Sequence, residues 1–118
     1  MPASMQQGGC HCGAVRYSVE IDPTAEAITC NCSICGRSGS YLQFVPTDKF
    51  TLETGEDNLT DYQFNKHAIH HSFCKTCGIK SFARGQGPKG PMVAINVRCL
   101  DGVNTFDIPT KQFDGRAR

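Results

Sequence analysis

The sequence lacks a strong charge of either sign, because its 118 residues carry 12 basic and 11 acidic side chains and a net charge of +1. Lys and Arg are scattered, and the one visible cluster is the weak C-terminal group Lys111, Arg116 and Arg118. Proteins that bind duplex nucleic acid usually concentrate basic residues on one face. We therefore expect no nucleic-acid partner.

Long apolar segments are also absent. No apolar run approaches the length of a membrane span, and the polar N-terminus, residues 1–9, has no apolar core of a signal peptide. We expect a cytoplasmic protein with no membrane partner. Thiols stay reduced in that compartment, so the eight cysteines indicate metal or redox chemistry more than disulfides.

Helical periodicity is nearly absent, and no repeat, linker or boundary divides the chain, so we expect one domain over residues 1–118. Apolar residues alternate from Val15 to Ile21, which is typical of a strand with one buried face. The predicted strands are residues 14–21, 41–45, 50–53, 59–64, 68–73, 79–84, 92–97 and 105–108. Residues 54–58 are predicted to turn and residues 85–91, rich in Gly and Pro, to form a loop. Short strands between regular turn signals predict a mainly antiparallel β fold.

Seven of the eight cysteines fall in three clusters, and Cys99 stands alone. The clusters are Cys10-His11-Cys12-Gly13, Cys30-Asn31-Cys32-Ser33-Ile34-Cys35 and Cys74-Lys75-Thr76-Cys77-Gly78. A glycine after such a pair allows a tight turn whose backbone N–H groups point at the sulfurs. Cys99 is interpreted as a packed thiol.

The first and third clusters together offer the four thiolates that a structural zinc site needs. We expect Cys10, Cys12, Cys74 and Cys77 to form this site, which would close a long loop of chain. Structural zinc can contribute on the order of 10 kcal/mol to the folding of a small domain. The alternative is four buried thiols without metal.

The middle cluster offers three thiolates, from Cys30, Cys32 and Cys35, and three protein ligands with an open position are typical of a reactive zinc site. Zinc with three thiolates has a charge of about −1, so it would hold an incoming thiol as thiolate better than it would activate water. The alternatives are a second structural site, completed by a His or by Cys99, and a redox dithiol.

Histidines are not expected to be metal ligands here. On a strand His70 and His71 would point to opposite faces, and we interpret them and His67 as solvated or satisfied in the core. His11, between two expected ligands, is predicted to face outward.

These clusters resemble the motifs of the glutathione-dependent formaldehyde-activating enzyme (GFA) family. The resemblance rests on segments 9–13, 30–39, 73–78 and 96–101 and extends over residues 8–107. It implies a mainly β fold of two zinc-ribbon-like sheets, the β-tent, joined by a structural zinc on Cys10, Cys12, Cys74 and Cys77. It also implies a second zinc on Cys30, Cys32 and Cys35.

The family's namesake joins glutathione to formaldehyde, giving S-hydroxymethylglutathione, and is classed as a carbon–sulfur lyase. Two departures from the family pattern bear on substrate selectivity: Asn31 stands where His is frequent, and His70-His71-Ser72 stands where many members carry a basic residue.

The leading hypothesis is a zinc-dependent carbon–sulfur lyase-like enzyme whose catalytic residues are Cys30, Cys32 and Cys35. Its partner would be a small thiol such as glutathione, with the loop 85–91 and Arg37, Lys66 and Arg84 as candidates to bind the tripeptide's carboxylates. The alternatives are a non-catalytic zinc module that binds a partner and a methionine sulfoxide reductase-like redox enzyme that uses Cys99.

Overall fold

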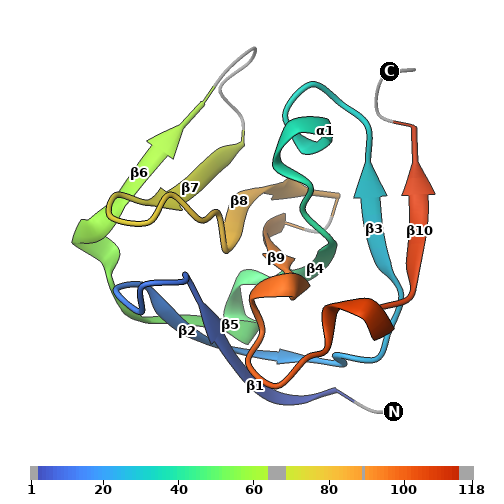
Figure 1. Cartoon of the computed structure of the whole chain (residues 1–118), viewed down its shortest axis with the longest axis horizontal. Coiled ribbons are helices and arrows are strands. Elements are labelled where there is room, and N and C mark those ends of the chain that lie inside the picture. Colours follow the sequence, from blue (N-terminus) through green and yellow to red (C-terminus); the bar gives the residue numbers. More distant parts are fainter. Residues whose placement is uncertain (1–2, 64–68, 89, 115–118) are drawn as a thin grey trace.

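The structure is a computed structural model that describes residues 3–63, 69–88 and 90–114, and these residues form two β-sheets with short helical turns (Figure 1). The smaller sheet has the order β1 (Ser4–Gly9), β2 (Arg16–Ile21), β5 (Phe50–Thr54). The larger sheet has the order β10 (Thr110–Phe113), β3 (Ala27–Cys30), β4 (Leu42–Pro46), β9 (Gly90–Asn96), β8 (Phe82–Gly87), β7 (His70–Cys74), β6 (Leu59–Tyr62). The helical segments are α1 (Cys35–Ser38) and the 3-10 turns Thr47–Lys49, Glu56–Asn58, Val97–Cys99 and Thr105–Asp107.

The core lies between the two sheets. The alternating residues of β2 are buried, as their pattern predicts, and Tyr17 has no exposed surface. The centroid of the Tyr17 ring lies 5.3 Å from that of Phe50 in the small sheet and 6.0 Å from that of Phe82 in the large sheet. These aromatic contacts join the two sheets through apolar packing.

The two faces of the large sheet have different roles. In β9, Val93 and Ile95 have no exposed surface and belong to the core. Ala94 lies between them and therefore points to the opposite face. The strand register continues this second face as a row across β4, β9, β8 and β7, formed by Phe44, Ala94, Ala83 and His71.

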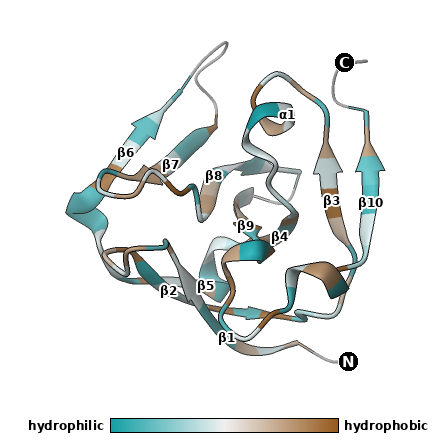
Figure 2. Cartoon of the chain, viewed as in Figure 1, coloured by the Kyte–Doolittle hydropathy of each residue, from teal (hydrophilic) through white to brown (hydrophobic). Residues whose placement is uncertain are grey.

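The edges of the large sheet are polar. Figure 2 shows hydrophilic residues along much of β10 and β6, its two outermost strands, and such residues discourage pairing with another chain. β10 runs parallel to β3, beside it in Figure 1, and places Phe113 opposite Cys30. The other strand pairs are antiparallel.

The mainly β, two-sheet prediction is confirmed, and the strands predicted at 14–21, 41–45, 50–53 and 92–97 are β2, β4, β5 and β9 to within two residues at each end. The predicted turn at 54–58 is also present, with Gly55 at a φ of 95°. β6 and β7 correspond to the strands predicted at 59–64 and 68–73, of which residues 64–68 lie outside the described residues.

Three local predictions are wrong. Residues 105–107 form a 3-10 turn instead of a strand, because the side chain of Asn104 accepts a hydrogen bond from the Phe106 N–H. The predicted loop 85–91 is mostly strand, because the β8–β9 ladder continues to the pair Gly87 and Gly90. The strand predicted at 79–84 begins only at Phe82. Strands β1, β3 and β10 lack a strong alternating pattern and were not predicted.

Candidate functional site

The sulfur atoms of Cys10, Cys12, Cys74 and Cys77 all lie within 4.8 Å of one another. The Sγ atom of Cys12 is 3.6 Å from those of Cys10 and Cys74. Tetrahedral zinc with Zn–S bonds of about 2.3 Å would separate its sulfurs by about 3.8 Å. All eight cysteines are free, so the spacing reflects four thiols around one centre and not disulfides. These four residues fit a tetrahedral metal ion.

Polar hydrogens converge on this four-cysteine cluster. The Val15 N–H donates to Cys10 Sγ at 3.3 Å, and the Thr76 N–H donates to Cys74 Sγ at the same distance. The Asn58 side chain also donates to Cys74 Sγ, at 3.4 Å. Such donors stabilise thiolates. The turns that aim them need Gly13 and Gly78, whose φ values are 86° and 80°.

The thiols of this cluster compete for ionisation. The backbone N–H of Cys77, supported by that of Thr76, lowers the pKa of Cys74 to about 6. At Cys12 the Ala14 N–H lowers the pKa, but burial and the neighbouring sulfurs outweigh it and raise the value to about 11. Four thiolates this close repel one another, and a cation at the centre would neutralise that repulsion, so this donor set could hold a metal ion.

The four-cysteine cluster joins the two sheets. Cys10 and Cys12 follow β1 of the small sheet, whereas Cys74 ends β7 of the large sheet. A metal ion bound there would therefore link the sheets across a separation of 62 residues between Cys12 and Cys74.

The Sγ atoms of Cys30, Cys32 and Cys35 form a second group, again within 4.8 Å of one another. Cys30 ends β3, Cys35 begins α1, and Cys32 lies in the turn between them. The Cys32 N–H donates to Cys30 Sγ at 3.4 Å, and the Cys35 N–H donates to Cys32 Sγ at 3.5 Å. Within the described part of the chain, no fourth Cys, His or carboxylate joins this group.

Ionisation is uneven in this three-cysteine cluster as well. Burial, reinforced by the adjacent Cys32, raises the pKa of Cys35 to about 12. Burial also acts on Cys32, but the Cys35 N–H and the neighbouring thiols outweigh it and bring its pKa below the usual value. The donor set is soft sulfur, which suits zinc and related metals.

The three-cysteine cluster borders a pocket of about 410 Å³. Its floor is the second face of the large sheet, including the row Phe44, Ala94, Ala83 and His71, with Ile28 and Leu42 beside them. The remaining lining residues are Ile69, Lys80 and Phe113. Because both alanines are small, the floor leaves space in front of the sulfurs.

Lys80 and His71 are the two polar side chains of the pocket apart from the cysteines. Lys80 Nζ lies 3.2 Å from His71 Nδ1. Burial lowers the pKa of Lys80, opposed by the nearby thiols of Cys35 and Cys32. Burial and the charge of Lys80 lower the pKa of His71. The positive end of Lys80 therefore acts electrostatically on the cysteine cluster.

The expected split of the histidines over two faces is confirmed. His71 is buried in the pocket floor, while His70 is exposed, with its Nδ1 2.7 Å from Asp61 Oδ2. His11 is exposed, as expected. His67 lies outside the described residues. Sequence reasoning missed Lys80, although its position three residues after Cys77, just past the turn of the four-cysteine cluster, is a signal that could have found it.

Two of the residues considered for carboxylate binding, Arg37 and Arg84, do not line the pocket. Arg84 is on the core face of β8, where its guanidinium lies 5.1 Å from the Phe50 ring centre and 5.4 Å from that of Phe82. Arg37 donates to the Ser33 carbonyl at 2.8 Å and borders a separate hollow. Lys66 lies outside the described residues, and the described residues of the predicted loop 85–91 lie mostly in β8 and β9.

Cys99 is not part of either cluster. It ends a 3-10 turn, and burial raises the pKa of its thiol to about 11. A thiol that resists ionisation is a poor nucleophile at neutral pH. This environment is consistent with the interpretation of Cys99 as a packed thiol.

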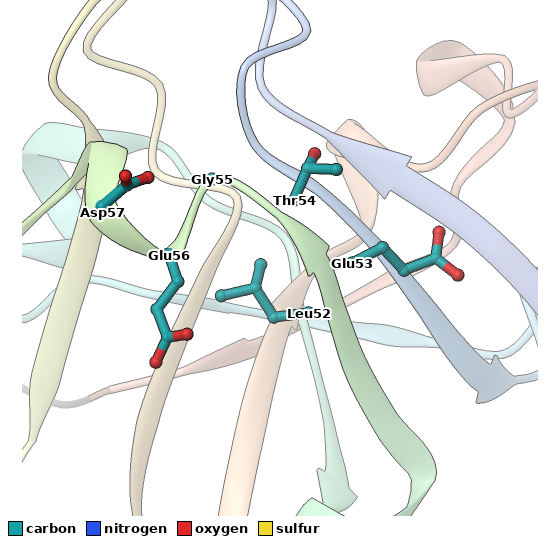
Figure 3. Close-up of a pocket in the computed structure, with 6 residues that line it drawn as sticks. All are labelled: Leu52, Glu53, Thr54, Gly55, Glu56 and Asp57. Carbon is teal, nitrogen blue, oxygen red and sulfur yellow. The ribbon is translucent and has the colours of Figure 1, made fainter.

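A further pocket, of about 470 Å³, lies along the end of β5 and the following turn (Figure 3). It contains the carboxylates of Glu53, Glu56 and Asp57, which point in different directions in the close-up. They do not converge on a common centre, and they are not among the described groups of three or more clustered metal ligands. The candidate functional site is therefore at the cysteine clusters and not at this acidic pocket.

No helix among the described residues has the length and apolar character to cross a membrane.

The structure resembles the crystal structure of a Rhodobacter sphaeroides protein with a TM-score of 0.77 and 36% sequence identity. The match covers 89% of this chain and 99% of that chain. A sequence profile described as glutathione-dependent formaldehyde-activating enzyme matches residues 5–115. With nearly its whole length matched, this chain belongs to the glutathione-dependent formaldehyde-activating enzyme (GFA) family.

Proposed function

We propose that this protein is a zinc-dependent carbon–sulfur lyase-like enzyme that makes and breaks thiol–aldehyde adducts such as S-hydroxymethylglutathione. The observation that carries the proposal is the contrast between the two cysteine clusters. Four sulfurs close one centre, whereas three sulfurs face a pocket and leave a position for a ligand from outside. Family membership supports glutathione as the thiol and an aldehyde as its partner.

Each cluster has its own part in this proposal. Zinc on Cys10, Cys12, Cys74 and Cys77 would be structural, because four protein ligands complete its coordination. Zinc on Cys30, Cys32 and Cys35 would take an incoming thiol as its fourth ligand and keep it deprotonated at neutral pH.

The reaction itself is a reversible addition. The thiol first releases its proton to water. The thiolate sulfur then forms a bond to the aldehyde carbon, the π electron pair of the carbonyl moves to oxygen, and that oxygen takes one proton back from water. In reverse, the proton leaves, the carbonyl reforms and the C–S bond breaks. No oxidant or reductant is consumed.

Lys80 is the residue of this chain best placed to assist. Negative charge develops on the carbonyl oxygen as sulfur adds, and a cation in an apolar pocket stabilises such charge far better than one in water. Lys80 is partly buried and borders the same pocket as the three sulfurs. Its contact with His71 orients the ammonium group.

The test uses zinc-loaded, reduced protein with glutathione and formaldehyde at equilibrium. Exchange NMR measures how fast free formaldehyde and the thiohemiacetal interconvert. We expect faster exchange with the protein, loss of that effect in Cys32→Ser, and a decrease of about 10²–10³-fold in Lys80→Met, as when an oxyanion-stabilising donor is removed. Cys99→Ser should catalyse the exchange at the native rate.

Two results would contradict the proposal. Unchanged exchange with fully zinc-loaded protein, for formaldehyde and for a longer aldehyde alike, would remove the enzymatic role and favour a binding module in which both metals are structural. Loss of activity in Cys99→Ser, with both metals retained, would instead favour redox chemistry at that thiol.

A further inference from the structure

We infer that the aldehyde preferred by the three-cysteine site carries an apolar substituent, an aliphatic chain or an aromatic ring, and that such aldehydes fit the site better than formaldehyde does. This inference rests on the proposed function and names the substrate class of the same site. It follows from the chemistry of the pocket beside the sulfurs.

The first observation is the pocket floor. The aldehyde carbon must meet the thiolate next to Cys30, Cys32 and Cys35, so whatever is attached to that carbon extends over the floor. The central floor positions are Ala94 and Ala83, which are register neighbours between Phe44 on β4 and His71 on β7. Formaldehyde has no substituent and would leave this apolar space of about 410 Å³ to water. Each buried methylene of a longer aldehyde would tighten binding about fourfold.

The second observation is the rim. Phe44 is 50% exposed, Ile69 is 49% exposed and Phe113 is 44% exposed, although all three are large apolar side chains. They come from β4, from the segment before β7 and from β10, yet they border one pocket. Scattered exposed apolar residues need no explanation, but a group around a pocket indicates contact with an apolar ligand.

The third observation concerns charge. Glutathione carries two carboxylates, and binding both inside the pocket would need more than one cation. Among the described residues, Lys80 is the only Lys or Arg that lines it. In this proposal the tripeptide approaches with its sulfur and keeps its carboxylates outside. The pocket interior is left for the aldehyde's substituent, with Lys80 facing the carbonyl oxygen.

The experiment compares hexanal with formaldehyde, each at equilibrium with glutathione and the zinc-loaded full chain, by exchange NMR. We expect the catalysed exchange, expressed as kcat/KM, to be at least tenfold higher for hexanal. A second readout does not depend on activity: 1-hexanol, which cannot react, should shift the amide resonances of residues around the floor, and methanol should not.

Two variants and a matched control locate the effect. Ala94→Leu fills the floor and should weaken 1-hexanol binding and lower the hexanal-to-formaldehyde preference by at least tenfold. Phe113→Ala removes part of the rim and should weaken 1-hexanol binding severalfold. Phe106→Ala removes another exposed phenylalanine, 95% exposed and outside the pocket, and should change neither quantity.

The outcomes separate the two proposals. Catalysed exchange with formaldehyde that is equal to or faster than that with hexanal, together with no 1-hexanol binding, would overturn the apolar substrate class and leave the lyase function intact. No catalysed exchange with either aldehyde would overturn the lyase function and this inference with it. A preference for hexanal in the native protein, lost in Ala94→Leu, would support both the lyase function and the apolar substrate class.

Discussion

Gly78 follows Cys77 in the turn of the four-cysteine cluster and has a φ of 80°, a conformation that L side chains resist. A methyl group built there meets nothing within 4 Å, so only the backbone conformation opposes a side chain. We expect Gly78→Ala to lower the free energy of unfolding of the metal-loaded protein by about 1–2 kcal/mol. Urea unfolding followed by circular dichroism measures it.

Gly36 is the matched control for that substitution. It lies in α1 outside the positive-φ region, and an added methyl would meet only Asn31 atoms, at 3.6 Å or more. Gly36→Ala should be neutral or stabilise the protein by up to about 1 kcal/mol, since alanine favours helix. If both variants lost the same unfolding free energy, the turn conformation at Gly78 would not be the cause of the destabilisation.

Tyr17 carries the one polar atom of the aromatic core. Its hydroxyl is buried, and no described group accepts or donates a hydrogen bond to it. An unpaired buried hydroxyl costs about 1–3 kcal/mol, whereas the ring keeps its packing without it. We expect Tyr17→Phe to leave the stability unchanged or raise Tm by a few degrees in a thermal melt. A destabilisation above about 1 kcal/mol would mean that the hydroxyl has a partner in solution.

At the scale of elements, β10 supports the three-cysteine cluster without contributing a ligand. It pairs with β3 and sets Phe113 beside Cys30. A chain that ends after Pro109 would leave β3 as an edge strand. The backbone at Cys30 would then lack its pairing with β10 and would be more mobile. We expect a chelator to remove metal from the three-cysteine site at least severalfold faster, with metal at the four-cysteine site released at the native rate.

The control for the truncation is Lys111→Ser, which changes an exposed side chain of β10 and keeps its backbone pairing. It should release both metals at native rates. If the truncated chain also behaved like the native protein, β10 would not be what holds Cys30 in place.

The sequence predicted some elements and missed others for physical reasons. β2 and β9 alternate large apolar residues with polar or small ones, so their buried faces are visible in the sequence. β10 has four exposed residues and β3 has four residues in all, so tertiary pairing forms them more than their own composition does. The hairpin at 85–91 was missed because glycine and proline disfavour strands locally, while pairing with the neighbouring strand overrides that preference.

The candidate site was also predicted only in part. Cysteine spacing indicated both ligand sets, because ligands of one centre fall close together in sequence pairs. The pocket could not be predicted, because its floor collects residues from β3, β4, β9, β8 and β7. Lys80 gains its role only from that assembly.

For the molecule as a whole, the two clusters differ in what they support. The four-cysteine cluster ties one sheet to the other, so Cys74→Ser should lower Tm by more than 10 °C or prevent folding, because metal binding there is part of the folding free energy. Cys32→Ser should lose one metal equivalent and keep the fold. Metal analysis and a thermal melt of both variants test this, and similar melting behaviour in the two would contradict the assignment of structural and reactive sites.

The alternation along β9 has a consequence for how such a protein can change over generations. Val93 and Ile95 maintain the interior while Ala94, between them, shapes the ligand space. Point substitutions at Ala94 can therefore retune ligand preference while the hydrophobic interior persists. Inserting or deleting one residue in β9 would exchange the two faces, moving isoleucine into the ligand space and alanine into the interior. We therefore expect replacements in this strand to change ligand preference, and changes of its length to disrupt the core.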